Sequence, residues 1–199
     1  MLLRRLTPFI LSAIITAACA GAPTEAPPSA AAVLSPMPGT IGSPVAMPVD
    51  PTATPTGPQA PPIESDVWIN TPPLNWASLR GKVTLVEFWT FECINCQHVF
   101  PIMRSLYADY HDQAFTLIGV HSPELSAERI VENVKRAVKD EELRYPIAID
   151  NDFANWNRYH NLYWPAWYLV DKRGLIRYTH AGEGGEDETR AWIDKLLAE

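Results

Sequence analysis

The stretch VEFWTFECINCQHVFP, from Val86 to Pro101, decides the fold of this chain. Its first part belongs to the apolar run VTLVEFW, in which apolar side chains occupy both faces, as in a strand at the centre of a parallel sheet. Two cysteines, Cys93 and Cys96, follow where this run gives way to a helical pattern. The stretch therefore predicts a buried strand that ends at a cysteine pair near the start of a helix.

Outward from this stretch, strand-like and helix-like patterns alternate along the chain. Strands are expected at residues 83–89, 114–121, 145–149, 166–170 and 175–179, and helices at about 95–110, 126–142, 152–159 and 187–198. The turn between the last two strands contains Gly174, which favours a hairpin. This order indicates an α/β sandwich with a mixed central β-sheet flanked by helices. We expect one such domain at residues 63–199.

The residues before this domain have a different composition. Of the 19 prolines in the chain, 12 lie between residues 20 and 62, among Ala, Thr, Ser and Gly and only two charged residues. A segment of this composition cannot bury enough apolar surface to fold. We expect residues 20–62 to be a disordered Pro/Ala/Thr-rich linker that acts as a tether.

The first 19 residues have the pattern of an export signal. Two arginines precede an apolar run from Phe9 to Ala18, which is shorter than the roughly 20 residues needed to span a bilayer. Residues 15–19, ITAAC, resemble a bacterial lipobox, in which Cys19 would become the lipid-modified first residue of the mature chain. Cleavage at an A-x-A site around Cys19 would instead give a soluble secreted product. We expect an exported protein, at the outer face of the cytoplasmic membrane or in the periplasm.

The charge of the chain bears on its partners. The net charge is −7, and no cluster or run of Lys and Arg interrupts this acidic balance. Binding to the phosphate backbone of a nucleic acid depends on such a basic surface. We therefore expect no nucleic-acid partner.

The Cys93–Cys96 pair has three alternative uses: a metal site, a structural disulfide or redox chemistry. A structural zinc site needs four ligands, but the chain has no second C-x-x-C, and its five histidines lack ligand spacing. A disulfide that spans two residues closes too short a loop to stabilise the fold. Redox chemistry is therefore expected, with no metal and with no cofactor beyond a redox-active Cys93–Cys96 disulfide.

The two cysteines have different expected roles. Cys93 lies at the expected helix N-terminus, where free N–H groups and the helix dipole favour a thiolate, so it is the expected nucleophile. Cys96 lies one turn into the helix and is more shielded. We expect Cys96 to attack the mixed disulfide and release the partner.

The run VEFWTFECINCQHVFP resembles thioredoxin-like proteins, in particular the exported TlpA/ResA-type redoxins and the thioredoxin-like domain of DipZ-type proteins. Three further positions match this resemblance. Pro101 corresponds to the proline that kinks the family's first helix, and Glu87 corresponds to a buried acid, which is usually Asp in thioredoxins. Trp164-Pro165 resembles the cis-proline segment that faces the dithiol. The resemblance implies a thioredoxin-like fold and places Pro165 beside the cysteines.

Glu87 also has an expected role that follows from its position in an apolar strand. Burial should raise the pKa of a lone carboxyl group, which suits a group that takes the proton of Cys96. A structural ion pair is the alternative use of this carboxylate. Trp164, together with Trp89 or Phe91, is expected to form an aromatic rim for the substrate, although the latter two side chains also suit the core.

These residues point to an extracytoplasmic thiol-disulfide oxidoreductase, and the resemblance to TlpA/ResA-type redoxins implies that it reduces protein disulfides rather than forms them. Relatives of the TlpA/ResA type reduce apocytochrome or copper-site cysteines, so the resemblance implies such proteins as substrates and a membrane thiol-disulfide donor. The first alternative is a copper metallochaperone that uses Cys93, Cys96 and His121, because thiolates select Cu(I). A thiol peroxidase is a further alternative, since Thr90-x-x-Cys93 matches the end of the peroxiredoxin motif.

Overall fold

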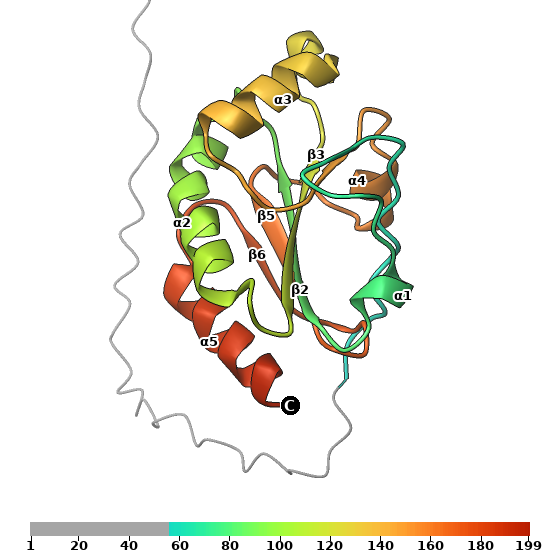
Figure 1. Ribbon diagram of the computed structural model, residues 1–199, viewed down its shortest axis with the longest axis vertical. Coiled ribbons are helices and arrows are strands. Elements are labelled where there is room, and N and C mark those ends of the chain that lie inside the picture. Colours follow the sequence, from blue (N-terminus) through green and yellow to red (C-terminus); the bar gives the residue numbers. More distant parts are fainter. Residues whose placement is uncertain (1–55) are drawn as a thin grey trace, which may run out of the picture. The chain divides into compact units, whose positions relative to one another are not determined.

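The computed structural model describes residues 56–199, which form a six-stranded sheet covered by helices (Figure 1). The expected signal peptide, Cys19 and the expected linker up to residue 55 lie outside the described residues. None of the helices in residues 56–199 combines the length and the apolar character needed to cross a membrane. In chain order the elements are β1 (Trp68–Ile69), α1 (Trp76–Leu79), β2 (Val83–Trp89), α2 (Ile94–Tyr110), β3 (Phe115–His121), the 3-10 helix η1 (Ser126–Arg129), α3 (Val131–Asp140), β4 (Ile147–Ile149), α4 (Ala154–Arg158), β5 (Ala166–Val170), β6 (Ile176–Ala181) and α5 (Glu186–Ala198).

Strand β2 lies inside the sheet, as its apolar run predicts. The strand order is β1-β4-β3-β2-β5-β6, and all seven residues of β2 are buried. Strand β2 pairs in parallel with β3 and antiparallel with β5, so the expected mixed sheet is confirmed. The carboxyl end of β2 leads directly to Cys93, which precedes the first residue of α2. The cysteine pair is thus attached to the most buried strand of the domain.

Alternate side chains of β2 enter two separate hydrophobic cores. Leu85 and Trp89 contribute to the core under α2, α3 and α5, whereas Val86 and Phe88 contribute to the core under α1 and α4. Because side chains alternate along a strand, Glu87 lies on the same face as Leu85 and Trp89. This alternation places a carboxyl group beneath helix α2, which carries Cys96.

The prediction of a helix at residues 126–142 is wrong for its first turn. The structure has the short η1 there, and α3 begins only at Val131, after Ile130 in an extended conformation. Val134 and Val138 are buried as their spacing predicts, but Ile130 is 52% exposed. The apolar spacing wrongly included Ile130, whose extended backbone separates η1 from α3.

The folded domain begins before the expected boundary at residue 63. Gln59 forms a bridge with Leu175, and the N–H of Ala60 donates to the carbonyl of Gly174 over 2.9 Å. The carbonyl of Pro61 accepts hydrogen bonds from two aromatic side chains of the domain. The last residues of the expected linker therefore pack against the domain, because its hairpin turn supplies backbone partners for them.

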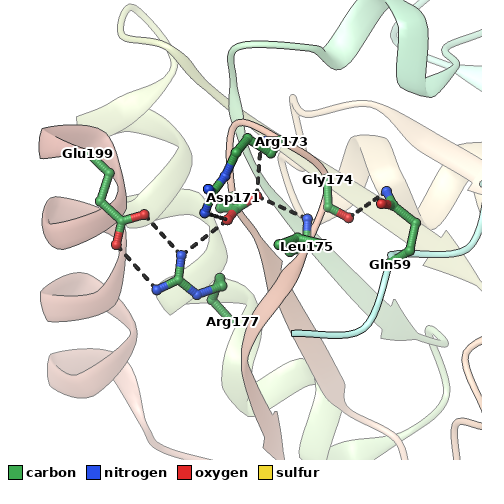
Figure 2. Close-up of polar contacts among 7 residues, drawn as sticks. All are labelled: Gln59, Asp171, Arg173, Gly174, Leu175, Arg177 and Glu199. Carbon is green, nitrogen blue, oxygen red and sulfur yellow. Dashed lines mark hydrogen bonds and ion pairs between the residues drawn. The ribbon is translucent and has the colours of Figure 1, made fainter. Parts of the chain in front are cut away.

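A buried carboxylate fixes the turn between β5 and β6. Asp171 accepts hydrogen bonds from the N–H groups of Arg173 and Leu175 and from both neighbouring guanidinium groups, and Arg177 extends this network to Glu199 on α5 (Figure 2). Burial opposes the charge of Asp171, but the hydrogen bonds from Leu175 and Arg173 and the two guanidinium groups outweigh it. Together they lower the pKa of this carboxyl group. The hairpin is thereby joined to the C-terminal helix.

Replacing Asp171 with Asn is expected to destabilise the domain by roughly 1 to 3 kcal/mol at pH 7, because buried donors lose a charged acceptor. A lowered folded pKa means that this stabilisation is complete above the unfolded pKa, near 4, and is lost as the pH falls through the folded value. The difference in the free energy of unfolding between the wild type and Asp171→Asn should therefore become smaller below about pH 4. Urea unfolding at pH 7 and pH 3 measures this difference. Asp112→Asn, at a side chain that is 92% exposed, is the control and should change little.

Candidate active site

The two cysteines differ in accessibility as expected. Cys93 is the N-cap residue of α2 and is half-buried, whereas Cys96 is fully buried within the first turn of the helix. Ile94 and Asn95 between them are exposed, and both sulfurs are free thiols. A partner can therefore reach Cys93 directly, while Cys96 lies behind it.

The buried thiol of Cys96 needs a base before it can react. Burial raises the pKa of Cys96 well above its ordinary value, and the nearby Cys93 and Glu87 raise it further. A hydrogen bond from the backbone N–H of Thr90 acts in the opposite direction without compensating for burial. Because only the thiolate attacks a disulfide, a nearby proton acceptor would accelerate any reaction of Cys96.

Glu87 is the nearby carboxyl group. Its side chain is fully buried, and its Oε2 accepts a hydrogen bond of 3.0 Å from the hydroxyl of Tyr145. Burial raises the pKa of Glu87 to about 8, against the lowering effect of the Tyr145 hydroxyl. Its other oxygen, Oε1, has no hydrogen-bond partner among the described residues. The alternative use, a structural ion pair, is not found within residues 56–199, where the hydrogen-bond partner of Glu87 is the neutral hydroxyl group of Tyr145.

The Trp164–Pro165 peptide bond is cis, as the resemblance implies. The carbonyl oxygen of Trp164 lies 3.9 Å from Sγ of Cys93 and accepts its S–H. Trp164 is half-buried, and its indole N–H donates to the carbonyl of Ser122 over 3.0 Å. The segment therefore presents backbone groups next to the accessible thiol.

Trp89 is not available as part of an aromatic rim, which corrects that expectation. It is fully buried, and its ring contacts Phe100 at 5.3 Å and His121 at 4.9 Å between centroids. The alternation of β2 directs it into the core under α2. Phe91, in the loop after β2, is half-buried and stacks on His121. Trp164 and Phe91 remain the predicted substrate contacts.

His121 belongs to the wall of the site rather than to a metal centre. It ends β3, is fully buried, and its Nε2 lies 3.4 Å from the hydroxyl oxygen of Thr90. Burial lowers the pKa of His121 to about 4, so the ring is neutral at pH 7. Within residues 56–199, no three His, Cys, Asp or Glu side chains are grouped so that they could hold a metal ion. Cys93, Cys96 and His121 thus do not form the ligand set of the copper alternative.

Glu128 is a site residue that the sequence analysis missed. Its carboxylate is fully buried and accepts hydrogen bonds from the N–H of Glu92 at 2.9 Å and from the N–H groups of Glu124 and Leu125 at 2.7 Å each. Burial opposes its charge, but the Thr90 hydroxyl and these N–H groups outweigh it and lower the pKa of Glu128. The residue before Cys93 is thereby fixed to the loop after β3.

The sequence signal for the missed residues is weak. Glu128 has the same local pattern as a solvated acid on an amphipathic helix, and Tyr145 has that of a core aromatic before a strand. The partner of Glu128 lies 36 residues away, in the loop after β2, and the partner of Tyr145 lies 58 residues away, in β2. No local pattern in the sequence relates such distant positions.

Known proteins with similar sequences contain the same kind of domain. The chain is 43% identical to the protein DipZ of Mycobacterium bovis over 133 residues, which cover 65% of this chain but 19% of DipZ. It is 27% identical to the thiol-disulfide oxidoreductase ResA of Bacillus cereus over 118 residues, which cover 59% of this chain and 65% of ResA. The chain therefore corresponds to about a fifth of DipZ. The expected resemblance to ResA-type and DipZ-type proteins is confirmed.

The fold is also found among solved structures. A thiol-disulfide isomerase from Corynebacterium glutamicum superposes with a TM-score of 0.62 and 26% identity, and covers 70% of this chain and 97% of its own. Solved structures of thioredoxin-like proteins also superpose on this chain, which confirms the expected thioredoxin-like fold. The sequence profile of the AhpC/TSA family matches residues 56–179, which include β2, both cysteines and Pro165. Because this match extends over more than half of the sequence, the chain belongs to the AhpC/TSA family.

Proposed function

We propose that this chain is a thiol-disulfide oxidoreductase that reduces disulfides in partner proteins. The observation that carries this proposal is the arrangement of an accessible thiol, Cys93, at the N-terminus of α2 with a second, buried thiol one turn behind it. The carbonyl group of Trp164 beside Cys93 is placed to bind the backbone of an incoming peptide. The printed names of ResA and of the C. glutamicum structure support the same chemistry.

The reaction begins at Cys93. Its thiolate attacks one sulfur of the partner disulfide, the partner S–S bond breaks, and one partner cysteine leaves as a thiolate. Cys96 then transfers its proton to Glu87 and attacks Sγ of Cys93, which releases the second partner thiolate. The products are a Cys93–Cys96 disulfide and a partner that has gained two electrons. A membrane thiol-disulfide donor restores the dithiol for the next cycle.

The proposed substrates come from the resemblance to TlpA/ResA-type redoxins, and the proposed location comes from the sequence of residues 1–19. Apocytochrome or copper-site proteins with paired cysteines are the proposed substrates, because that resemblance implies them. The pattern of residues 1–19 supports export, and the lipobox-like ITAAC supports an anchor through Cys19 at the outer face of the cytoplasmic membrane. Outside the cytoplasm, disulfide substrates persist long enough to require an enzyme that reduces them.

A trapping experiment tests the proposal. Cys96→Ser should keep the first attack but lose the second, so the variant should accumulate mixed disulfides through Cys93 with proteins of the cell envelope. Cys93→Ser is the matched control and should trap nothing. Mass spectrometry of the trapped complexes would identify the partners, and the absence of any Cys93-linked partner would contradict the proposal.

Three activity measurements on the purified chain distinguish the reductase from the two alternative functions. A reductase should reduce a model protein disulfide such as insulin, whereas a copper metallochaperone should bind Cu(I) tightly at one ion per chain without that activity. A thiol peroxidase should consume hydrogen peroxide with a thiol donor. The arrangement of the Cys93–Cys96 pair favours insulin reduction over the other two results.

A further inference from the structure

The phenol ring of Tyr145 reaches the buried carboxyl group from outside strand β2. Tyr145 precedes β4 and is fully buried, with its ring against Tyr107 of α2 at 6.0 Å between centroids. Gly119 of β3 makes room for this ring, because a Cβ atom at residue 119 would lie 3.0 Å from Cε2 of Tyr145. The absence of a side chain at residue 119 thus allows the hydroxyl to reach Oε2 of Glu87.

The two carboxyl oxygens of Glu87 have different surroundings. Oε2 is held by Tyr145, whereas Oε1 has no hydrogen-bond partner among the described residues. On the neighbouring strands, Glu87 pairs with Gly119 and Trp167, neither of which titrates. Its electrostatic neighbours are Cys96 of α2 and Tyr145, and Cys93 and Arg104 act on those two groups in turn.

We propose that Tyr145 is a positioning residue, which holds Oε2 of Glu87 so that Oε1 is free to take the proton of Cys96. The inference rests on the proposed function and assigns a role within its second step. In that step the Cys96 S–H bond breaks, an O–H bond forms on Glu87, and the Cys96 thiolate attacks Cys93. Tyr145 keeps its own proton throughout.

The hydroxyl group of Tyr145 also keeps the pKa of Glu87 closer to neutral pH than burial alone would allow. A hydrogen bond donated to a carboxylate favours the charged form, so it counteracts the effect of burial on the pKa of Glu87. Without that donor the carboxyl group would remain protonated to higher pH. It would then be a base in a smaller fraction of the molecules at pH 7.

The test follows the attack of Cys96 directly. A chromogenic aromatic disulfide reacts with the reduced chain and releases one coloured thiolate when Cys93 attacks and a second when Cys96 resolves the mixed disulfide. The pH dependence of the second release reports on proton transfer from Cys96. In the wild type its midpoint should lie near the pKa of Glu87, about 8.

Tyr145→Phe keeps the ring and removes only the hydroxyl group. We expect the midpoint of the second release to rise by about one pH unit and its rate at pH 7 to fall roughly three- to tenfold. Tyr110→Phe is the matched control, because Tyr110 is also buried and donates to a carboxylate, Asp194, at 2.9 Å. The midpoint of the second release in Tyr110→Phe should equal that of the wild type. This should hold even if Tyr110→Phe and Tyr145→Phe are destabilised equally.

The outcomes separate the inference from the proposed function. An unshifted midpoint in Tyr145→Phe, with Glu87→Gln still slow, overturns the role of Tyr145 and leaves the dithiol mechanism intact. The absence of a second release in the wild type overturns both. Should Tyr145→Phe fail to fold, a fluorotyrosine at position 145 keeps the shape and strengthens the donor. It should move the midpoint to lower pH, and an upward or absent shift would contradict the inference.

Discussion

Glu87→Gln is expected to become more stable relative to the wild type as the pH rises, and to carry out the second reaction step more slowly than the wild type. The pKa of Glu87 is about 8 in the folded chain and near 4.5 when the side chain is exposed. Between pH 4.5 and 8, Glu87 is therefore protonated in the folded chain but ionised in the unfolded chain. The free energy of unfolding of the wild type falls as the pH rises through this range. Glutamine has no proton to lose, so the stability of the variant relative to the wild type should increase by roughly 5 kcal/mol between pH 4.5 and a pH above 8.

The same substitution removes the proton acceptor of Cys96. We expect the attack of Cys96 to slow by about 10- to 100-fold at pH 7, which is the usual contribution of a positioned base. Urea unfolding at pH 5 and pH 9 measures the stability, and the second thiolate release measures the rate. Glu132→Gln, at a side chain that is 71% exposed, should change neither. An equal stability difference at both pH values would show that Glu87 is not protonated in the folded state.

Glu128→Ala is expected to destabilise the domain by roughly 2 to 4 kcal/mol and to loosen the loop that carries Cys93. The substitution leaves three backbone N–H groups and the Thr90 hydroxyl without their charged acceptor. Urea unfolding measures the loss of stability. Hydrogen exchange of the N–H of Glu92 measures the mobility of the loop, since this N–H donates its hydrogen bond to the Glu128 carboxylate.

Two variants control this result. Glu124→Ala removes a neighbouring exposed carboxylate but keeps the backbone N–H that Glu128 binds, so it should behave as the wild type. Glu128→Gln keeps the shape of the side chain, and its stability should lie between those of the wild type and Glu128→Ala. Unchanged exchange at Glu92 in Glu128→Ala would refute the idea that this carboxylate orders the cysteine loop.

The parts of the fold that depend on local sequence were predictable. The buried strand β2 follows from its continuous apolar run, and the mixed sheet follows from the alternation of strands and helices with a terminal hairpin. Two residues separate Cys93 from Cys96, so the position of Cys93 just before α2 and that of Cys96 in its first turn follow from the strand-to-helix change alone. The cis peptide bond before Pro165 could be expected only from the resemblance to known proteins.

The parts that depend on tertiary contacts were not predictable. The expected helix at residues 126–142 counted Ile130 among its buried positions, whereas the backbone is extended there and Ile130 is exposed. The contact of Glu128 with the N–H of Glu92 joins loops that are 36 residues apart along the chain. The sequence leaves both Trp89 and Phe91 open as partners of Trp164 in a substrate rim or as core residues, and the alternation of β2 places Trp89 in the core. Tyr145 meets Glu87 only through the pairing of β3 with both β2 and β4.

The first described residues of the chain and Cys93 lie at opposite ends of strand β2. Gln59 contacts the turn between β5 and β6, which lies beside the first residues of β2, whereas Cys93 follows the last residue of that strand. The first described residues therefore lie at the end of β2 opposite the loop that carries Cys93. A partner protein that binds at this thiol would not meet them.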